Sequence, residues 1–235
     1  MDHSSARIAI ILFGGTGTRF SPDMPKQFES LNDKPLCYYA VKACEKSQFV
    51  DKILIVAHKD YLTKTQEVLS PFGFTKVLAY APGGESRQES VYAALSYLEG
   101  NGLIDSKDLI LIQDGDRPGI SEEIIKENFL VAKKLGGAVT AFPSTDSVFL
   151  SPNGEKVDSY LDRKLVYRAE TPQTFVFGDY LFAARKAHAE KKSFTDDASC
   201  FLSYGGEVGI VLSNGHNQKI TRREDMLLFQ RGRHE

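Results

Sequence analysis

The sequence predicts an α/β fold in three layers, with a mostly parallel central sheet and a β-hairpin arm that projects from it. Two observations carry this prediction. Short apolar runs alternate with amphipathic segments from Ile8 to Phe142, a rhythm typical of strands joined by right-handed helical crossovers. Glycine-rich or acidic turns follow several of these runs, at the positions where open α/β sheets bind their ligands.

The elements expected in the first part of the chain follow from hydrophobic patterning. Each expected strand is an apolar run that can be buried on both faces, and each expected helix has one apolar face. The expected strands are Ile8–Phe13, Lys52–Ala57, Thr75–Tyr80, Asp108–Gln113 and Ala138–Phe142. The expected helices are Pro35–Lys46, one capped by Asp60 that ends near Leu69, one that opens from the loop Pro82–Ser90 and ends at Glu99, and one from Ser121 to about Lys134.

From Asp146 the rhythm changes to that of a hairpin. Ser147–Ser151 and Lys156–Leu161 flank a turn of the type Pro-Asn-Gly-Glu. An arm over residues 145–167 has few core residues of its own, so we expect it to pack on a second copy of the chain. The rest should form a strand at Thr174–Phe177, helices at Gly178–Glu190 and Asp196–Leu202, a strand at Val208–Leu212, a segment Asn217–Thr221 and a last helix from about Glu224. Residues 1–235 are expected to form one domain.

Composition excludes several classes of protein. The 235 residues carry a net charge of −2, which gives no global attraction to nucleic acid or to a membrane. The apolar runs are far shorter than the ~20 residues that span a bilayer, and no signal segment precedes the first strand. Cys37, Cys44 and Cys200 have no disulfide or zinc spacing. The five histidines have no ligand spacing either, so a reduced, cytoplasmic protein is expected.

The stretch from Ile8 to Phe28 predicts a phosphate-binding loop after the first strand. It contains Gly14, Gly15 and Gly17, followed by Arg19 and Lys26. Glycines let backbone N–H groups approach an anion, and two cations on one loop can neutralise a triphosphate. A Lys-Ser/Thr pair and a third dinucleotide-type glycine are absent from the loop, which sets aside the two commonest phosphate loops. The alternative is a tight turn with two surface cations.

Six blocks then occur in the order and spacing of one family: GGTGTRF with PKQF, GGESRQES, QDGDRP, DRKLVYRAETPQTF, TDDAS and NQKIT. The sequence resembles the methylerythritol-phosphate cytidylyltransferases and their relatives, the ribitol-phosphate cytidylyltransferases, from Ile8 to about Leu228. The resemblance implies a Rossmann-like sheet of the nucleotide-diphospho-sugar transferase type. It also implies transfer of CMP from CTP to a polyol phosphate with release of pyrophosphate, with Mg²⁺ or another divalent cation, in a homodimer joined through the arm.

The resemblance also assigns roles by position. It places the catalytic cations at Arg19, Lys26, Arg163 and Lys219. It places CTP contacts at Leu12, Phe13, Gly14, Gly15, Gly17, Gly84, Glu85, Arg87, Ser90 and Asp114, and acceptor contacts at Arg117, Ser147, Thr171 and Thr195. Asp114 is also the expected metal ligand. Because the arm reaches across the dimer in this family, Ser147 and Arg163 are expected to serve the neighbouring subunit's site.

The chemistry agrees with these residue types. Attack by a phosphate oxygen on the α-phosphorus of a triphosphate brings two polyanions together, so alignment and charge neutralisation dominate and no side-chain nucleophile is needed. Structural alternatives stand beside these roles. Arg87 could pair with Glu85 or Glu89 on a helix surface, and Asp114 could cap a turn. Lys219 could be a solvated strand residue, and Thr195, Asp196 and Asp197 could cap the following helix.

The identity of the acceptor is the least determined part of this prediction. Asp116 adds a negative charge where relatives commonly have a small residue, and the Gly14-Gly15 pair is closer to the ribitol branch. The TDDAS block is closer to the methylerythritol branch, which makes 2-C-methyl-D-erythritol 4-phosphate the preferred acceptor and ribitol 5-phosphate the alternative. Two rival functions remain: a nucleotidyltransferase using UTP or a sugar phosphate, which the GGESRQES loop argues against, and a catalytically silent nucleotide-binding regulator.

Overall fold

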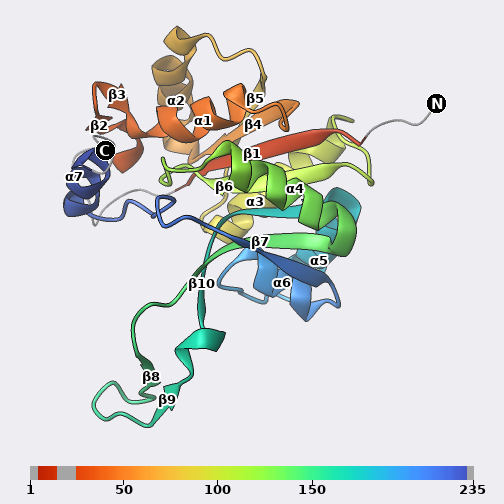
Figure 1. Ribbon diagram of the computed structural model, residues 1–235. Coiled ribbons are helices and arrows are strands. Elements are labelled where there is room, and N and C mark those ends of the chain that lie inside the picture. The colour runs from red at the N-terminus through yellow and green to blue at the C-terminus, as the bar shows by residue number, and fades with distance from the viewer. Residues whose placement is uncertain (1–4, 15–24, 232–235) are drawn as a thin grey trace.

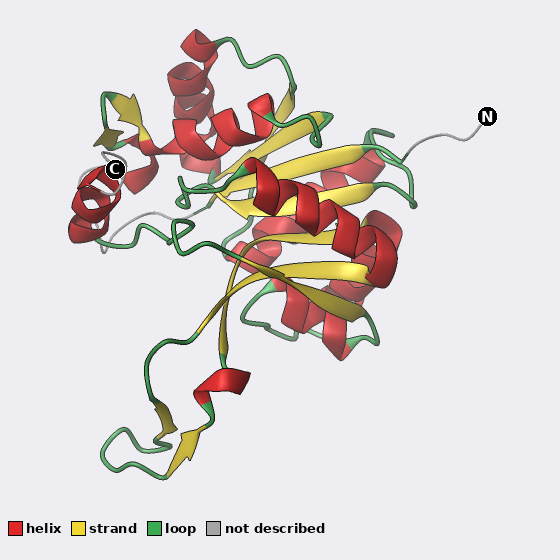
Figure 2. Ribbon diagram, viewed as in Figure 1, coloured by secondary structure: helices red, strands yellow, loops and turns green. Residues whose placement is uncertain are grey.

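The computed structural model describes residues 5–14 and 25–231. A seven-stranded sheet forms the centre, with helices on both faces and an arm that extends away from it (Figures 1 and 2). The strand order is β11-β7-β10-β6-β1-β4-β5. These strands are β1 (Arg7–Phe13), β4 (Lys52–Ala57), β5 (Val77–Pro82), β6 (Leu109–Asp114), β7 (Gly136–Pro143), β10 (Tyr167–Val176) and β11 (Glu207–Leu212).

The helices are α1 (Leu36–Lys46), α2 (Leu62–Leu69), α3 (Arg87–Gly100), α4 (Glu122–Leu135), α5 (Phe177–Ala189), α6 (Asp197–Ser203) and α7 (Arg223–Arg231). Short 3₁₀ helices lie at Lys26–Phe28, Lys59–Tyr61, Ser70–Phe72 and Arg163–Leu165. Two small hairpins pair β2 (Ser30–Leu31) with β3 (Lys34–Pro35) and β8 (Val148–Leu150) with β9 (Ser159–Leu161). The predicted three-layer α/β fold with a hairpin arm is confirmed. Within the part of the chain that the structure describes, every helix is too short or too polar to cross a membrane.

The register of the parallel strands brings their carboxyl ends to one edge. β1 pairs in parallel with both β4 and β6, so that Leu12 lies beside Val56 on one side and Asp114 on the other. β10 is antiparallel between β6 and β7, and its register shifts between Glu170 and Gln173. The turns after β1, β5 and β6 therefore share the edge where such sheets bind ligands.

Each face of the sheet has its own core. Ile8 and Ile10 of β1 face α3, α5 and α6, whereas Ala9 and Ile11 face α1 and α4. All four side chains are fully buried, which explains why these strands read as continuous apolar runs. Burial of each large aliphatic side chain stabilises the fold by about 1.5–3 kcal/mol, so the two cores hold the strand ends in place.

Several predicted elements occur at the predicted residues. The strand at residues 52–57 has the predicted bounds, and Ser121 caps α4 by accepting a 3.3 Å hydrogen bond from the backbone N–H of Ile124. Cys37 and Cys44 are fully buried core residues of α1. Burial raises the pKa of the Cys37 thiol to about 12, which keeps it protonated and unreactive.

Several boundaries differ from prediction, among them that of β9, which begins at Ser159 rather than Lys156. β5 begins at Val77 rather than residue 75, because the side chain of Glu45 accepts the N–H groups of Thr75 and Lys76. Asp60 does not begin the second helix: His58 caps a 3₁₀ turn over Lys59–Tyr61, and α2 starts at Leu62. Of the strand expected at residues 174–177, residues 174–176 are the end of the ten-residue β10, and Phe177 begins α5.

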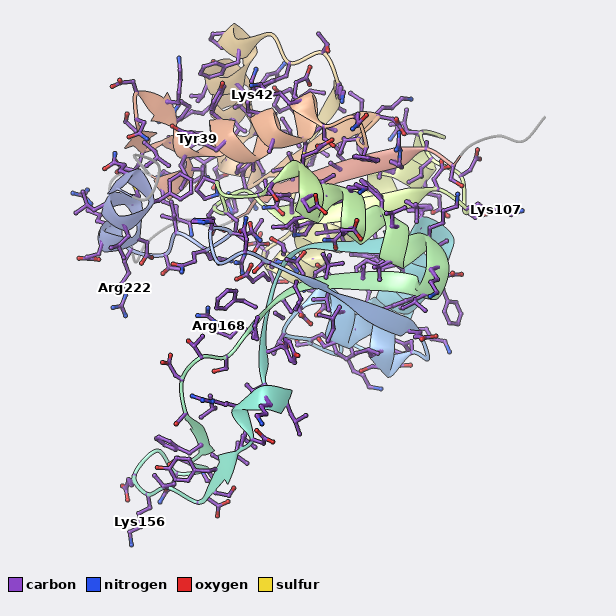
Figure 3. The ribbon with its side chains drawn as sticks, viewed as in Figure 1. Tyr39, Lys42, Lys107, Lys156, Arg168 and Arg222 are labelled. Carbon is purple, nitrogen blue, oxygen red and sulfur yellow. The ribbon has the colours of Figure 1, made fainter. Side chains whose placement is uncertain are left out.

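The arm carries apolar side chains without a core beneath them. Phe149 and Tyr160 are paired across β8 and β9 with ring centroids 5.8 Å apart, yet they are 48% and 69% exposed. Leu165, at the base of the hairpin, is 79% exposed. Figure 3 shows how far the arm reaches, with Lys156 at its tip and Arg168 near its root.

Candidate active site

Asp114, the last residue of β6, is the centre of a charged cluster at the carboxyl edge of the sheet. Its Oδ1 accepts a hydrogen bond from Nε of Arg87 and its Oδ2 accepts one from Nζ of Lys219, both at 2.9 Å. Nε of Arg117 lies 3.9 Å from Oδ2. These residues come from β6, the start of α3 and the segment after β11, so the fold joins turns that are far apart in sequence.

Arg87 links this cluster to α6. Its Nη2 donates to Oδ2 of Asp197 at 2.7 Å, and the hydroxyl of Tyr180 donates to Oδ1 of the same carboxylate at 2.8 Å. Because the guanidinium donates one hydrogen bond to each of two carboxylates, its plane is fixed. Arg87 therefore contacts Asp114 and Asp197, and not Glu85 or Glu89 as a surface residue would.

The electrostatics of the cluster keep Asp114 ionised. Burial opposes its ionisation, but the positive charges of Arg87 and Lys219 and their hydrogen bonds hold the pKa of Asp114 well below its usual range. Burial likewise opposes the charge on Arg87, while Asp197 and Asp114 raise its pKa above the ordinary value. Both charged forms are thus stabilised mutually, as in a buried ion-pair network.

Lys26 lies at the other side of the same edge. Its Nζ donates a hydrogen bond to Oδ2 of Asp116 and a second one, at 2.8 Å, to the carbonyl of Ile220. Oδ2 of Asp116 is also 3.7 Å from Nζ of Lys219. The backbone N–H of Ile220 donates to the carbonyl of Asp116 at 2.9 Å. Lys26 therefore bonds both the segment after β6, through Asp116, and the segment after β11, through Ile220.

The turn between β5 and α3 is built around Ser90. Its buried hydroxyl donates to the carbonyl of Ser86 at 2.8 Å and accepts from the N–H of Gly84 at 3.1 Å. A Cβ on Gly83 would lie 2.7 Å from Oγ of Ser90, and one on Gly14 would lie 3.2 Å away. Glycine at these positions lets the first loop and the α3 N-terminus approach each other, as a nucleotide-binding edge requires.

The other predicted residues fall into three groups. Leu12 and Phe13 are buried, and the ring of Phe13 fills the space that a Cβ on Gly115 would need. Thr171 is buried, and its Oγ1 accepts the N–H of Asp114 at 3.0 Å. Glu85 is exposed, and its Oε1 lies 3.4 Å from Nζ of Lys59. Gly15, Gly17 and Arg19 lie outside the residues that the structure describes.

Ser147, Arg163 and Thr195 are exposed. Thr195 stands before α6, with Oγ1 3.4 Å from Oγ of Ser199. Ser147 and Arg163 belong to the arm, and Nη1 of Arg163 donates to the carbonyl of Thr145 at 3.3 Å. The arm points away from the sheet edge of its own chain (Figure 1). The structure thus brings Lys26, Arg87, Asp114, Arg117 and Lys219 together, but not the two arm residues.

Asp197 and Asn217 also join the cluster, although the sequence analysis assigned neither of them a role in the site. Asp197, expected only as a helix cap, binds Arg87, while its neighbour Asp196 provides the capping box of α6. The buried side-chain amide of Asn217 donates to Oε2 of Glu170 at 3.1 Å and to the carbonyl of Thr171 at 2.6 Å. The backbone carbonyl of Asn217 accepts a hydrogen bond from Nη1 of Arg117. The only sequence signal for either was its place inside the TDDAS and NQKIT blocks.

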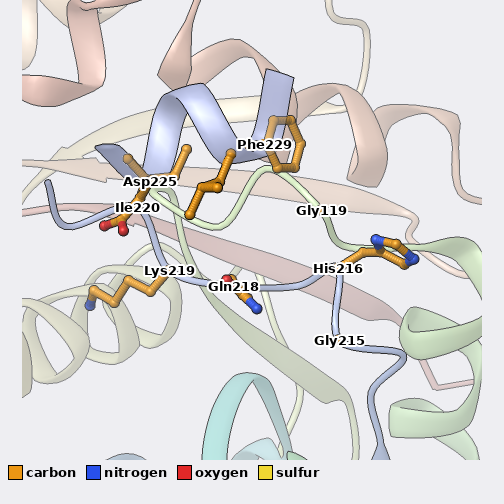
Figure 4. Close-up of a pocket in the computed structure, with 9 residues that line it drawn as sticks. Gly119, Gly215, His216, Gln218, Lys219, Ile220, Asp225 and Phe229 are labelled. Carbon is orange, nitrogen blue, oxygen red and sulfur yellow. The ribbon is translucent and has the colours of Figure 1, made fainter. Parts of the chain in front are cut away.

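The segment that carries Lys219 lies over a hollow of about 510 Å³. The hollow is lined by Gly119, Gly215, His216, Gln218, Lys219, Ile220, Asp225, Leu228 and Phe229. Figure 4 shows the side chain of Lys219 extending away from Phe229 of α7, and its Nζ reaches Asp114 instead. This segment is not part of the sheet, so Lys219 is not a solvated strand residue.

The donor set suits a magnesium ion that is shared with a substrate. Among residues 5–14 and 25–231 there is no group of three or more His, Cys, Asp or Glu residues that could hold a metal by themselves. Mg²⁺ is usually bound by one or two carboxylates together with substrate phosphates. Asp114 is ionised, and each of its oxygens has a second lone pair beyond the hydrogen bond that it accepts. The residues present therefore fit the ion.

Cations clustered around the carboxylates of Asp114 and Asp116, at the ligand-binding edge of a parallel α/β sheet, suit the class of enzyme that transfers phosphoryl-type groups by charge neutralisation. Within that class the chain is a nucleotidyltransferase. Residues 7–231 match the family model of 2-C-methyl-D-erythritol 4-phosphate cytidylyltransferase, and the chain belongs to this family.

Individual relatives agree with this assignment. The chain is 39% identical over 222 residues to a 2-C-methyl-D-erythritol 4-phosphate cytidylyltransferase of Petrotoga mobilis, covering 94% of this chain and 95% of the relative. It is 33% identical over 225 residues to a ribitol-5-phosphate cytidylyltransferase of Vibrio parahaemolyticus, covering 95% and 94%. The crystal structure of 4-diphosphocytidyl-2C-methyl-D-erythritol synthase from Anaerococcus prevotii has a TM-score of 0.82 at 23% identity, covering 98% of this chain and 97% of that one. This last similarity concerns the fold.

Proposed function

We propose that the chain transfers CMP from CTP to 2-C-methyl-D-erythritol 4-phosphate and releases pyrophosphate. The observation that carries the proposal is the convergence of Lys26, Arg87, Arg117 and Lys219 on the carboxylates of Asp114 and Asp116 at the ligand-binding edge of the sheet. Membership of the family supplies the nucleotide and the reaction type. Four cations at one edge are suited to a reaction between two polyanions.

Each group has a role that its position supports. Lys26, at the end of the first loop, neutralises charge on the reacting phosphates. The family resemblance gives the same role to Arg19, which lies outside the described residues. The Gly83–Gly84 turn and the start of α3, where the family resemblance places the cytosine and ribose contacts, hold the cytidine. Arg117 and Lys219 draw the acceptor phosphate to the same edge. Asp114 would hold Mg²⁺ together with the substrate phosphates, and the ion would supply Lewis-acid stabilisation of the phosphate oxygens.

We propose 2-C-methyl-D-erythritol 4-phosphate as the acceptor because of the sequence identity to named relatives. The relatives named as 2-C-methyl-D-erythritol 4-phosphate cytidylyltransferases reach 39% and 37% identity, whereas the ribitol-5-phosphate cytidylyltransferases stand at 33% and 31%. The TDDAS block favours the same choice, and its Asp197 is tied to Arg87 in the site. Ribitol 5-phosphate is the second candidate, because of the Gly14-Gly15 pair.

The test is pyrophosphate release from CTP and Mg²⁺ with the two acceptors offered in parallel. We expect kcat/KM for 2-C-methyl-D-erythritol 4-phosphate to exceed that for ribitol 5-phosphate by at least about tenfold, since discrimination between similar polyols rests on one or two hydroxyl contacts. A preference for ribitol 5-phosphate would reassign the enzyme to CDP-ribitol synthesis. Release with neither acceptor would support a silent nucleotide-binding protein. UTP in place of CTP should give no release.

A homodimer joined through the arm completes the proposal. The exposed apolar side chains of Phe149, Tyr160 and Leu165 are suited to burial against a second copy. Arg163 would then reach the other subunit's site.

We place the enzyme in the reducing cytoplasm, since its three cysteines are free and buried.

Subunit mixing tests this arrangement. Lys26→Ala and Arg163→Ala chains should each be nearly inactive alone. When they are denatured and refolded together, half of the dimers should carry one intact site, which restores about a quarter of wild-type turnover. Recovery requires that Lys26 and Arg163 of one site come from different chains. If the mixture stays as inactive as the separate variants, each site is built within one chain and the trans role of the arm is wrong.

A further inference from the structure

Asp116 is the one carboxylate of the cluster that the proposed chemistry does not use. Its Oδ2 accepts from Nζ of Lys26 and lies 3.7 Å from Nζ of Lys219. Its side chain is only 14% exposed, and that of Lys26 only 15%. Its Oδ1 is buried and accepts no hydrogen bond from the part of the chain that the structure describes. The carboxylate is thus aimed at the two lysines, and not at solvent.

The contact takes up the ammonium that should receive phosphate. A lysine ammonium has three N–H donors, and Asp116 and the Ile220 carbonyl accept from two of those of Lys26. A phosphate oxygen that binds the same nitrogen lies within a few ångströms of the Asp116 carboxylate, and the two anions repel each other. The repulsion is strong here, because both partners of the ion pair are largely removed from water.

The charge balance of the cluster points the same way. Ion pairs join Lys26, Lys219, Arg87 and Arg117 to Asp114, Asp116 and Asp197, which leaves one net positive charge among these described residues. Without Asp116 the same cluster would carry two. Asp114 has a use as a metal ligand and Asp197 as the second anchor of Arg87, whereas Asp116 only offsets positive charge.

We propose that Asp116 sets the affinity for substrate phosphate: it is an internal anion that competes with substrate phosphate for Lys26 and thereby weakens the binding of triphosphate and pyrophosphate. The inference rests on the proposed function, because it takes the phosphate site to be at Lys26. By offsetting the charge of Lys26, and to a smaller extent that of Lys219, Asp116 raises KM for CTP and speeds the release of pyrophosphate.

The test uses Asp116→Asn, which keeps the shape and removes the charge, with Asp116→Ala as a second variant in case one of them folds poorly. Asp179→Asn is the charge-matched control, because Asp179 is exposed and lies far from the cluster. Its neighbour Gly178 donates its N–H to the carbonyl of Ser106, which precedes β6 at the end opposite to Asp114. Dissociation constants are measured calorimetrically for CTP and for inorganic triphosphate, at two salt concentrations.

We expect both Asp116 variants to bind CTP and inorganic triphosphate about tenfold more tightly than wild type, with a steeper salt dependence, while Asp179→Asn stays within about twofold. In turnover, KM for CTP should fall while kcat changes little or falls. In a Lys26→Ala background most of the gain should vanish. Unchanged or weaker triphosphate binding in a folded variant would overturn the inference, and since binding is read separately from turnover, it can fail while the proposed function stands.

Discussion

Lys26→Ala should fold as wild type does and lose at least about a hundredfold in turnover. The loss follows from removal of one positioned cation from the reacting phosphates, which costs about 10²–10³ in rate for comparable charge-stabilising donors. The chain should still fold because Lys219, whose Nζ lies 3.7 Å from Oδ2 of Asp116, remains to balance the charge of Asp116 once Lys26 is removed. Pyrophosphate release under saturating CTP and acceptor gives kcat, and thermal unfolding followed by circular dichroism checks the fold.

Lys107→Ala is the matched control for that measurement. Lys107 is an exposed lysine just before β6 (Figure 3), at the end of the strand opposite to Asp114, so its removal changes net charge without touching the site. Its turnover should equal that of wild type. If Lys26→Ala turns over within about threefold of the control, Lys26 has no part in charge stabilisation of the kind described.

Asp114→Asn should be both inactive and less stable. The amide keeps the volume of Asp114, but it leaves Arg87 and Lys219 without the carboxylate that both contact at 2.9 Å. Removal of one partner from a buried ion pair costs about 3–5 kcal/mol of unfolding free energy. Loss of the metal ligand and of the positions of both cations should lower kcat by at least about a hundredfold. Chemical denaturation and pyrophosphate release measure the two effects.

The pH dependence separates the charge of Asp114 from its shape. Its pKa is lowered in the folded chain by Arg87 and Lys219, against the effect of burial, so its stabilisation is complete above the unfolded value of about 3.9 and is lost as pH falls below that value. The stability difference between wild type and Asp114→Asn should therefore be largest near neutrality and shrink below about pH 4. A difference that does not vary with pH would mean that packing, and not the ion pairs, sets the cost.

The sequence predicted the elements whose signal is local. The prediction was right to within one or two residues for β1 and β4, which have apolar residues on both faces, and for the capped helix α4. Burial pattern and helix capping depend on residues that are neighbours in the sequence. The start of β5 was missed because Glu45, thirty residues earlier, takes the N–H groups of Thr75 and Lys76. Such a contact depends on tertiary packing.

The site divides in the same way. Asp114 and Lys26 were predicted to meet because turns after parallel strands share one edge. The second carboxylate that Arg87 binds, that of Asp197, was not predicted. Asp196 caps α6, and only the packing of α6 against α5 decides which of these two aspartates turns inward. The pairing of Asp116 with Lys26 was likewise beyond the sequence, which showed an added negative charge but not the cation that it contacts.

The hydrogen bond from Lys26 to the carbonyl of Ile220 spans 194 positions of the chain. During synthesis the N-terminal part emerges first and can begin to fold, whereas the segment with Lys219 and Ile220 is made late. A nascent chain that has completed β1, β4, β5 and β6 has the first loop but not the lysine that neutralises Asp114. The charged edge is therefore completed only after Lys219 and Ile220 have been made, so a chain that stops before them holds Asp114 and Arg117 but cannot assemble a competent site.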